Sequence, residues 1–216
     1  MRKLISLVIT FALSALSMAS CAGNQTETSE TTEEYKPEEM KELIDGKKTL
    51  VAFFSHTGEN YGVGNITEGN THIIAKMIGE ATNGILFEIV PEKEYPHDSY
   101  DEVVEIAKQE KAAKARPAIK GDVNVDDYDV IFIGYPNWWG DMPMPVYTFL
   151  EKHNWNGKTV VPFCTHEGSG LSKTEKYVAE TCRGAKVRNG LAVRGETAQN
   201  KRDEARKSVK AWLDRL

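Results

Sequence analysis

Short apolar runs alternate with stretches of helical periodicity along most of the sequence. Four runs contain mostly apolar residues, as strands buried on both faces of a sheet do: Thr49–Phe54, Gly84–Val90, Tyr128–Tyr135 and Lys158–Thr165. A fifth strand is predicted at Ala185–Val193, which is more polar and is interrupted by Gly190. Apolar residues at helical spacing follow each run, in residues 73–81, 98–115, 146–150, 171–178 and 205–216.

This order predicts an α/β fold in three layers, with a parallel sheet of five strands covered by helices on both faces. Right-handed crossovers then leave little open except the order of the strands. Pro162 conflicts with the fourth strand, because proline has no N–H to donate to a neighbouring strand. We expect the loss to be tolerated because Pro162 is placed near the end of that strand.

The N-terminal segment has the pattern of a signal peptide, predicted over residues 1–20. It begins with Arg2 and Lys3, continues as an apolar run from Leu4 to Leu16, and ends in small residues. The run is too short and wrongly flanked for a membrane span, and a buried N-terminal helix is the alternative.

The letters "MASC" resemble the lipobox of bacterial lipoproteins, which implies that Cys21 is lipidated. Residues 21–46 are rich in Thr and Glu without apolar periodicity, so we expect a flexible acidic linker. The folded domain is predicted over residues 47–216. We therefore expect an exported protein whose only membrane contact is a lipid anchor on the periplasmic or surface side.

Composition and charge narrow the function. The chain has 216 residues, 40% of them hydrophobic, and a formal net charge of −5. An acidic chain without a basic stretch argues against a nucleic-acid partner. Cys164 and Cys182 remain in the folded domain, either as free buried thiols, which is the default, or as a disulfide, which export would permit. No cysteine spacing suggests a metal site.

The loop after the first strand, "SHTGENYGVGNITEGNT", has the features of a phosphate cradle. In parallel sheets ligands bind beyond the carboxyl ends of the strands. Ser55, Thr57 and Asn70 offer hydroxyl and amide groups, and Gly58 and Gly69 allow the backbone to approach a ligand closely. Thr71 opens the following helix, whose first N–H groups attract anions. The alternative is a solvated loop with a helix cap.

The same loop comes close to a nucleotide-binding P-loop. Residues 64–71 spell G-x-x-x-x-G-N-T, with Asn70 where a P-loop carries the lysine that meets the β- and γ-phosphates. The missing lysine favours a single phosphate held by neutral groups.

Two further loops indicate what the phosphate is attached to. Trp138 and Trp139 are adjacent in "GYPNWWGDMPMP", where they either cover a flat ligand or pack on the core and on a neighbouring helix. In "CTHEGSGL", His166 could act as an acid, a base or a donor, and residues 168–170 supply backbone N–H groups. Glu167 stands where a hydrolase elbow needs glycine. Flavin mononucleotide (FMN) fits all three loops.

Three segments, "FFSHTGEN…EGNTHIIAKMI", "IFIGYPNWWGDMPMPVYTFLE" and "VVPFCTHEGSGL", resemble the long-loop bacterial flavodoxin family, and the resemblance covers Lys48 to Leu216. It implies strand order 2-1-3-4-5 with FMN at the switch point.

The resemblance also implies roles for particular residues. The FMN phosphate would be held by Ser55, His56, Thr57, Gly58, Asn70 and Thr71. The isoalloxazine would be flanked on one side by Pro136, Asn137, Trp138, Trp139 and Gly140. Its other edge would be bordered by Thr165, His166, Glu167, Gly168, Ser169 and Gly170. Glu59–Glu68 is an insertion relative to the family pattern, so its role is open.

Two functions of different classes follow. One is a redox protein that carries electrons to a membrane or exported partner, with no catalytic side chain of its own. The other is an FMN-dependent NAD(P)H oxidoreductase that acts on quinones or other small acceptors. Open space over the flavin would favour the enzyme, and a covering tryptophan would favour the carrier. A binding module that has lost FMN is a third possibility, against which the intact phosphate loop argues. Acidic groups such as Glu167 and Asp141 are expected at the surface, where they would lower the flavin potential.

Overall fold

The computed structural model describes residues 42–216. The predicted signal peptide, Cys21 and residues 22–41 of the predicted linker lie outside the described residues. Residues 42–44 form a helical turn, and Leu43 is buried in the core with 3% of its surface exposed. The folded region therefore begins before residue 47, earlier than predicted, because Leu43 and Ile44 pack against the core.

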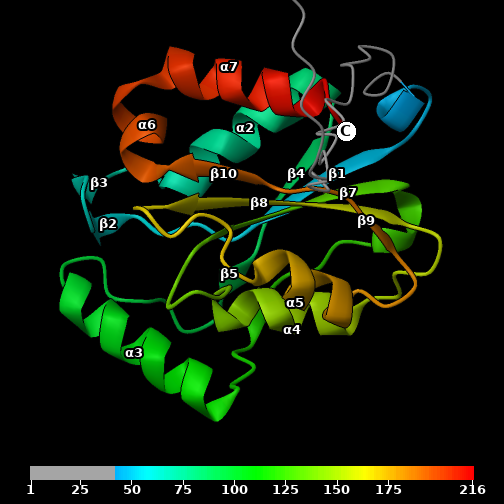
Figure 1. Ribbon diagram of the computed structural model, residues 1–216. Coiled ribbons are helices and arrows are strands. Elements are labelled where there is room, and N and C mark those ends of the chain that lie inside the picture. Colours follow the sequence, from blue (N-terminus) through cyan, green and yellow to red (C-terminus); the bar gives the residue numbers. More distant parts are fainter. Residues whose placement is uncertain (1–41) are drawn as a thin grey trace, which may run out of the picture. The chain divides into compact units, whose positions relative to one another are not determined.

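The central sheet is parallel and has the order β4-β1-β7-β8-β10, which in chain order is the predicted 2-1-3-4-5 (Figure 1). Its strands are β1 (Thr49–Phe53), β4 (Ile85–Glu88), β7 (Val130–Pro136), β8 (Thr159–His166) and β10 (Leu191–Arg194). A short strand, β9 (Lys186–Val187), also pairs with β8 in parallel. The predicted fold class is confirmed.

Helices cover both faces of the sheet (Figure 1). One face carries α2 (Asn70–Thr82), α6 (Gly195–Asn200) and α7 (Arg202–Leu213), and the other carries α4 (Met144–Lys152) and α5 (Thr174–Thr181). Alternate residues of each strand point to opposite faces. Val51 and Phe53 of β1 therefore join one buried cluster, whereas Leu50 and Ala52 join the other.

Pro162 is in the middle of β8 and not near its end, so that expectation was wrong. The missing N–H is tolerated because the neighbouring strand is broken at this point. The break separates β9 from β10, since Val160 of β8 pairs with Val187 and Phe163 pairs with Leu191. Gly190 lies in the break, and a Cβ there would be 3.0 Å from the Pro162 carbonyl oxygen. Pro162 on β8 and the interruption of the last predicted strand at Gly190 therefore lie opposite each other in the sheet.

Several short elements were not predicted. The inserted segment contains an antiparallel hairpin of β2 (Gly58–Asn60) and β3 (Gly64–Ile66). The predicted strand Gly84–Val90 ends at Glu88, and Val90 instead belongs to β5 (Val90–Pro91), which pairs with β6 (Ile119–Lys120). A 3₁₀ turn, η1 (Val125–Asp127), precedes β7. Elements of two or three residues are below the length at which periodicity gives a signal.

Helix α3 (Tyr100–Ala113) is set apart from the sheet, on the side of α4 and α5 (Figure 1). Ser99 caps its N-terminus by accepting a hydrogen bond from the Glu102 N–H. Among its residues only Val103 and Ala107 are buried. Val103, Val104 and Ala107 of α3 lie beside the loops at the carboxyl ends of the strands.

Cys164 and Cys182 are both free and buried, as the default interpretation had it. Within residues 42–216, no helix is long and apolar enough to cross a membrane.

Candidate functional site

A cavity of about 380 Å³ lies beyond the carboxyl ends of β7 and β8. It combines residues from the three predicted loops, the first of which includes the inserted segment, with residues from α3. The predicted residues that line it are Asn70, Pro136, Asn137, Trp138, Trp139, Thr165, His166, Glu167 and Ser169. Its volume falls within the range of small-molecule sites.

The first loop folds back onto the start of α2. Ser55 Oγ accepts a hydrogen bond of 3.1 Å from the His72 N–H, in the first turn of the helix. Gly69 precedes the helix, and a Cβ at this position would clash with Ser55 Oγ and lie 2.7 Å from the His56 carbonyl oxygen. Hydroxyl groups and the first N–H groups of α2 therefore lie together, which is the arrangement that binds anions.

The two polar residues at the start of α2 have side-chain partners. Thr71 and Thr165 are buried and share a hydrogen bond of 2.8 Å between their hydroxyl oxygens, which joins the first loop to the end of β8. Asn70 Oδ1 accepts 2.9 Å from Gln199 Nε2, which also donates 2.6 Å to the Glu68 carbonyl. Gln199 belongs to α6, and because that helix was not predicted, nothing in the sequence indicated this contact.

His56 and Thr57 do not line the cavity. With Ser55 they border a second hollow of about 250 Å³. The His56 ring stacks on that of His97 at 5.5 Å between centroids, and its Nε2 is buried without a partner. Burial, with a smaller effect of His97, lowers the pKa of His56 to about 4. The imidazole is therefore neutral near pH 7.

Trp138 and Trp139 form the turn of the third loop. The backbone of Trp138 exchanges hydrogen bonds of 2.9 and 3.1 Å with Asp141, and Trp139 and Gly140 between them have φ of +58° and +73°. These angles match a type I′ turn, which is costly for a tryptophan. Trp139 is held there by its indole N–H, which donates 3.1 Å to the Val104 carbonyl of α3, and by Lys111 Nζ, which donates 2.6 Å to the Trp139 carbonyl.

The packing alternative for the two tryptophans describes their contacts correctly. Trp138 lies edge-on to Phe54 and Tyr95 in the core, at 5.3 and 5.1 Å between centroids. Trp139 packs on α3 with 52% of its surface exposed. Both nevertheless line the cavity, so core packing and contact with a ligand are compatible here.

The third and fourth loops are bonded to each other through Asn137. Its Nδ2 donates 2.8 Å to the Gly170 carbonyl and 2.9 Å to Ser172 Oγ, while its Oδ1 accepts 2.9 Å from the Gly140 N–H. Gly140 and Gly170 thus help to hold the two loops together through Asn137, and they do not line the cavity.

In the fourth loop, His166 Nδ1 accepts 2.8 Å from the Gly168 N–H, so the neutral ring carries its proton on Nε2. Burial, and then Arg194, lowers the pKa of His166. Glu167 Oε1 accepts 3.1 Å from the Glu196 N–H at the start of α6, and burial raises the pKa of this carboxyl. The cavity wall here offers an N–H donor beside a carboxylate.

A family model described as Flavodoxin matches residues 48–216, which is most of the chain. The chain belongs to the flavodoxin family. A flavodoxin resemblance from Lys48 to Leu216 was predicted, and it is confirmed. No match was found among curated proteins.

Solved structures agree with the flavodoxin assignment. Two are flavoprotein candidates from Bacteroides species. The one from Bacteroides eggerthii is 33% identical, with a TM-score of 0.62 over 78% of this chain and 96% of that one. The one from Bacteroides uniformis is 32% identical, with a TM-score of 0.60 over 77% and 97%. A flavoprotein of Lactobacillus acidophilus, solved in complex with FMN, is 26% identical, with a TM-score of 0.53 over 73% and 99%.

Most of the residues predicted to flank the ring line one cavity, whereas Asn70 is the one residue predicted to hold the phosphate that lines it. Gly58 packs against the His97 backbone, where a Cβ would clash. The FMN-binding roles of these residues stay predictions.

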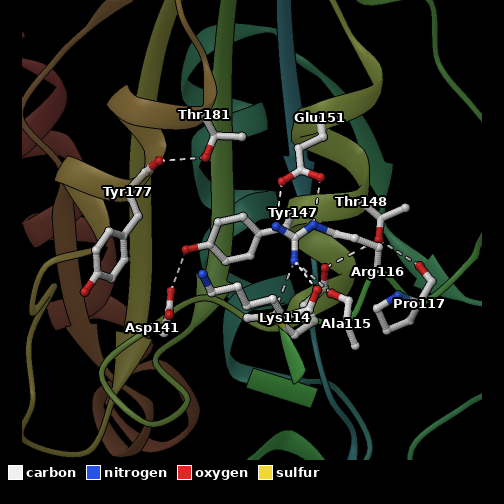
Figure 2. Close-up of polar contacts among 11 residues, drawn as sticks. Lys114, Ala115, Arg116, Pro117, Asp141, Tyr147, Thr148, Glu151, Tyr177 and Thr181 are labelled. Carbon is white, nitrogen blue, oxygen red and sulfur yellow. Dashed lines mark hydrogen bonds and ion pairs between the residues drawn. The ribbon is translucent and has the colours of Figure 1, made fainter. Parts of the chain in front are cut away.

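Asp141 is buried and not a surface charge, so the expectation for it was wrong. Its Oδ1 accepts 2.8 Å from both the Met142 N–H and the Tyr147 hydroxyl, and its Oδ2 lies 3.6 Å from Lys111 Nζ. Figure 2 shows Tyr147 of α4 pointing at Asp141. The Arg116 guanidinium lies 4.8 Å from the centre of the tyrosine ring. These contacts fix the end of the tryptophan turn against α4.

Sequence reasoning missed the remaining lining residues. They are Asn60, Tyr61, Tyr100, Val103, Val104 and Ala107. The first two come from the inserted hairpin and the others from α3. The helix itself was predicted, but nothing in its periodicity indicates that its apolar face borders these loops.

Proposed function

We propose that this flavodoxin binds FMN in the cavity and is a redox protein that passes electrons to a membrane-bound or exported partner. The observation that carries the proposal is the joining of a polar loop and helix start to a tryptophan-lined cavity, through Asn70, Thr71 and Thr165. The FMN bound by the Lactobacillus acidophilus relative supports the choice of cofactor.

The residues present fit FMN. The first N–H groups of α2 and the Ser55 hydroxyl beside them would hold the phosphate, since a helix start favours an anion. Trp138 and Trp139 would flank the ring system, and backbone N–H groups of residues 167–170 would meet its polar edge. FMN supplies the electron chemistry when bound, and the protein positions and tunes it.

Reduction of small acceptors is the second candidate. It is favoured by the apolar face of α3, which borders the cavity with Val103, Val104 and Ala107 and leaves room beside the tryptophans. A carrier that only docks to a protein partner has no need of such a wall. An FMN-dependent NAD(P)H oxidoreductase acting on quinones would use it.

The proposed location follows from the N-terminal pattern. A signal peptide over residues 1–20 and lipidation of Cys21 would anchor an exported protein at a bacterial membrane. The acidic linker would then hold the flavodoxin domain off the lipid surface.

Retention of FMN tests the proposal. Purified protein is mixed with FMN, freed of excess by gel filtration and measured by visible absorbance. The wild type should keep the flavin bands, and Ser55→Ala and Asn70→Ala should each weaken FMN affinity by about tenfold or more, because a hydrogen bond to a charged group contributes about 1.5–3 kcal/mol. Ser208→Ala on α7, whose hydroxyl bonds only within its helix, is the matched control. A wild-type protein that stays colourless would refute FMN binding.

A further inference from the structure

The cavity has a second wall that the residues predicted to bind the phosphate and the ring do not supply. It consists of Asn60 and Tyr61 from the β2–β3 hairpin and Tyr100, Val103, Val104 and Ala107 from α3, and we call it the acceptor wall. Its two parts are about forty residues apart in the sequence but meet in space. Tyr61 and Tyr100 are in contact at 5.9 Å between ring centroids.

The hairpin is firmly attached to the segment that leads into α3. The Glu59 N–H donates 2.7 Å to the His97 carbonyl, and Glu59 Oε2 accepts 3.1 Å from the Tyr100 N–H. Asn60 Nδ2 donates 3.2 Å to the Gly58 carbonyl, which fixes the strand itself. The hairpin therefore holds Tyr61 at a defined place beside Tyr100.

Helix α3 is attached to the rest of the site from the other side. Trp139 donates to Val104, and Lys111 donates to the Trp139 carbonyl. The Tyr95 hydroxyl donates 2.6 Å to Glu110 Oε2. The acceptor wall is thus a built part of the site that faces the predicted flavin loops.

Exposed aromatic rings gather on this wall. The large hydrophobic side chains that are exposed within residues 42–216 are Tyr61, Ile85, Leu86, Tyr100 and Trp139. The three aromatic ones all line this cavity, with Tyr61 63% exposed. Exposed apolar groups that cluster at a cavity mark a binding surface, and exposed aromatic rings favour a flat aromatic ligand.

Charge restricts the ligand further. None of the six residues of the acceptor wall is charged. A charged group of a ligand seated against this wall would therefore have no partner of opposite charge. The wall therefore suits a neutral ring better than a phosphate-bearing one.

We propose that the acceptor wall binds an uncharged, flat aromatic molecule against the flavin, with Tyr61 and Tyr100 as its stacking partners. The inference rests on the proposed FMN site and gives the inserted hairpin its role. It favours reduction of small aromatic acceptors over exchange with a protein alone.

The test is a binding measurement and needs no turnover. Oxidised, FMN-loaded protein is titrated with menadione in a calorimeter, without a reductant. Tyr61→Ala should weaken menadione binding by about three- to tenfold, as expected when one aromatic stacking partner is lost. Tyr61→Phe should keep wild-type affinity, because it keeps the ring. Ile85→Ala, which removes an exposed apolar side chain on the edge strand β4, should have no effect. Naphthoquinone sulfonate should bind more weakly than menadione.

Flavin absorbance of each sample separates this inference from the proposed function. Equal menadione affinity of Tyr61→Ala and wild type would overturn the proposal that the acceptor wall binds the aromatic molecule. So would a Tyr61→Ala protein that loses FMN but keeps its menadione affinity, because the hairpin would then belong to the cofactor site. If the wild type retains no flavin, the same titration is run on the flavin-free protein. Menadione binding that is weakened by Tyr61→Ala would then support the proposed role of the acceptor wall, and binding that is unaffected by Tyr61→Ala would overturn it.

Discussion

His56 is a buried ring whose position in the sequence suggested contact with a phosphate. The structure packs it against His97 and Tyr95, with its Nε2 unpartnered. Its neighbours Ser55 and Thr57 keep their hydroxyls near the start of α2 and the second hollow. The sequence indicates which residues surround the loop, but the direction of each side chain is decided by what packs beneath it.

The buried His56 should make the protein less stable in acid. Its pKa is about 4 when folded and near 6.5 when unfolded, so between these values the unfolded chain binds the proton and the folded one does not. The free energy of unfolding should therefore fall as pH falls from about 6.5 to about 4. His56→Phe removes this contribution and should flatten the curve over that window, measured by urea unfolding.

Ser208→Ala on α7, which removes no titratable group, is the control for this prediction, and it should keep the wild-type dependence on pH. A curve for His56→Phe that falls as steeply as that of the wild type would contradict the assignment to His56.

At the scale of elements, short-range periodicity predicted the long strands and helices, because burial repeats regularly along them. It missed α6 and the β2–β3 hairpin, which are short and depend on distant partners such as Glu167 and His97. The break between β9 and β10 shows the same limit. Gly190 was seen as an interruption, but its cause is Pro162 on the adjacent strand.

Arg116 connects the segment after α3 to α4 (Figure 2). Its guanidinium donates 2.7 and 2.6 Å to the two carboxylate oxygens of Glu151 and also donates to the Lys114 and Ala115 carbonyls. It lies 4.8 Å over the Tyr147 ring. This paired geometry is one that lysine cannot reproduce.

Arg116→Lys should lower the free energy of unfolding by about 1 kcal/mol, measured by urea denaturation, because it loses the paired bonds and the stacking. Arg206→Lys is the matched control, since Arg206 makes a single exposed bond of 2.7 Å to Glu80. It should change stability by less than about 0.5 kcal/mol. Equal effects at the two positions would mean that the geometry around Arg116 adds nothing.

At the scale of the whole molecule, the two sides of the sheet are separate buried clusters, and both cysteines of the described region are in the one beneath α4 and α5. Burial raises the pKa of each thiol to about 12. The thiolate that reacts with disulfide reagents is therefore scarce in the folded protein.

Cys164 and Cys182 should be unreactive until the domain unfolds. In a Cys21→Ser protein, Ellman's reagent should label almost no thiol under native conditions and both thiols in denaturant, because neither is in a disulfide. Absence of labelling in denaturant would indicate a disulfide and contradict the structure. When Cys164→Ser is added to this protein, one thiol should react in denaturant and almost none under native conditions.

The sequence by itself determined the alternation of strands and helices, the parallel sheet and the loops that carry the candidate chemistry. It could do so because apolar periodicity reports burial locally, and because the Ser/Thr/Asn and Trp segments follow strand ends. Only the tertiary structure decided that α3 and the inserted hairpin complete the cavity, that Asp141 is a buried anchor, and that His56 turns away from it. These features depend on which surfaces pack together, such as Tyr61 against Tyr100, which are about forty positions apart, and no local pattern encodes which distant surfaces meet.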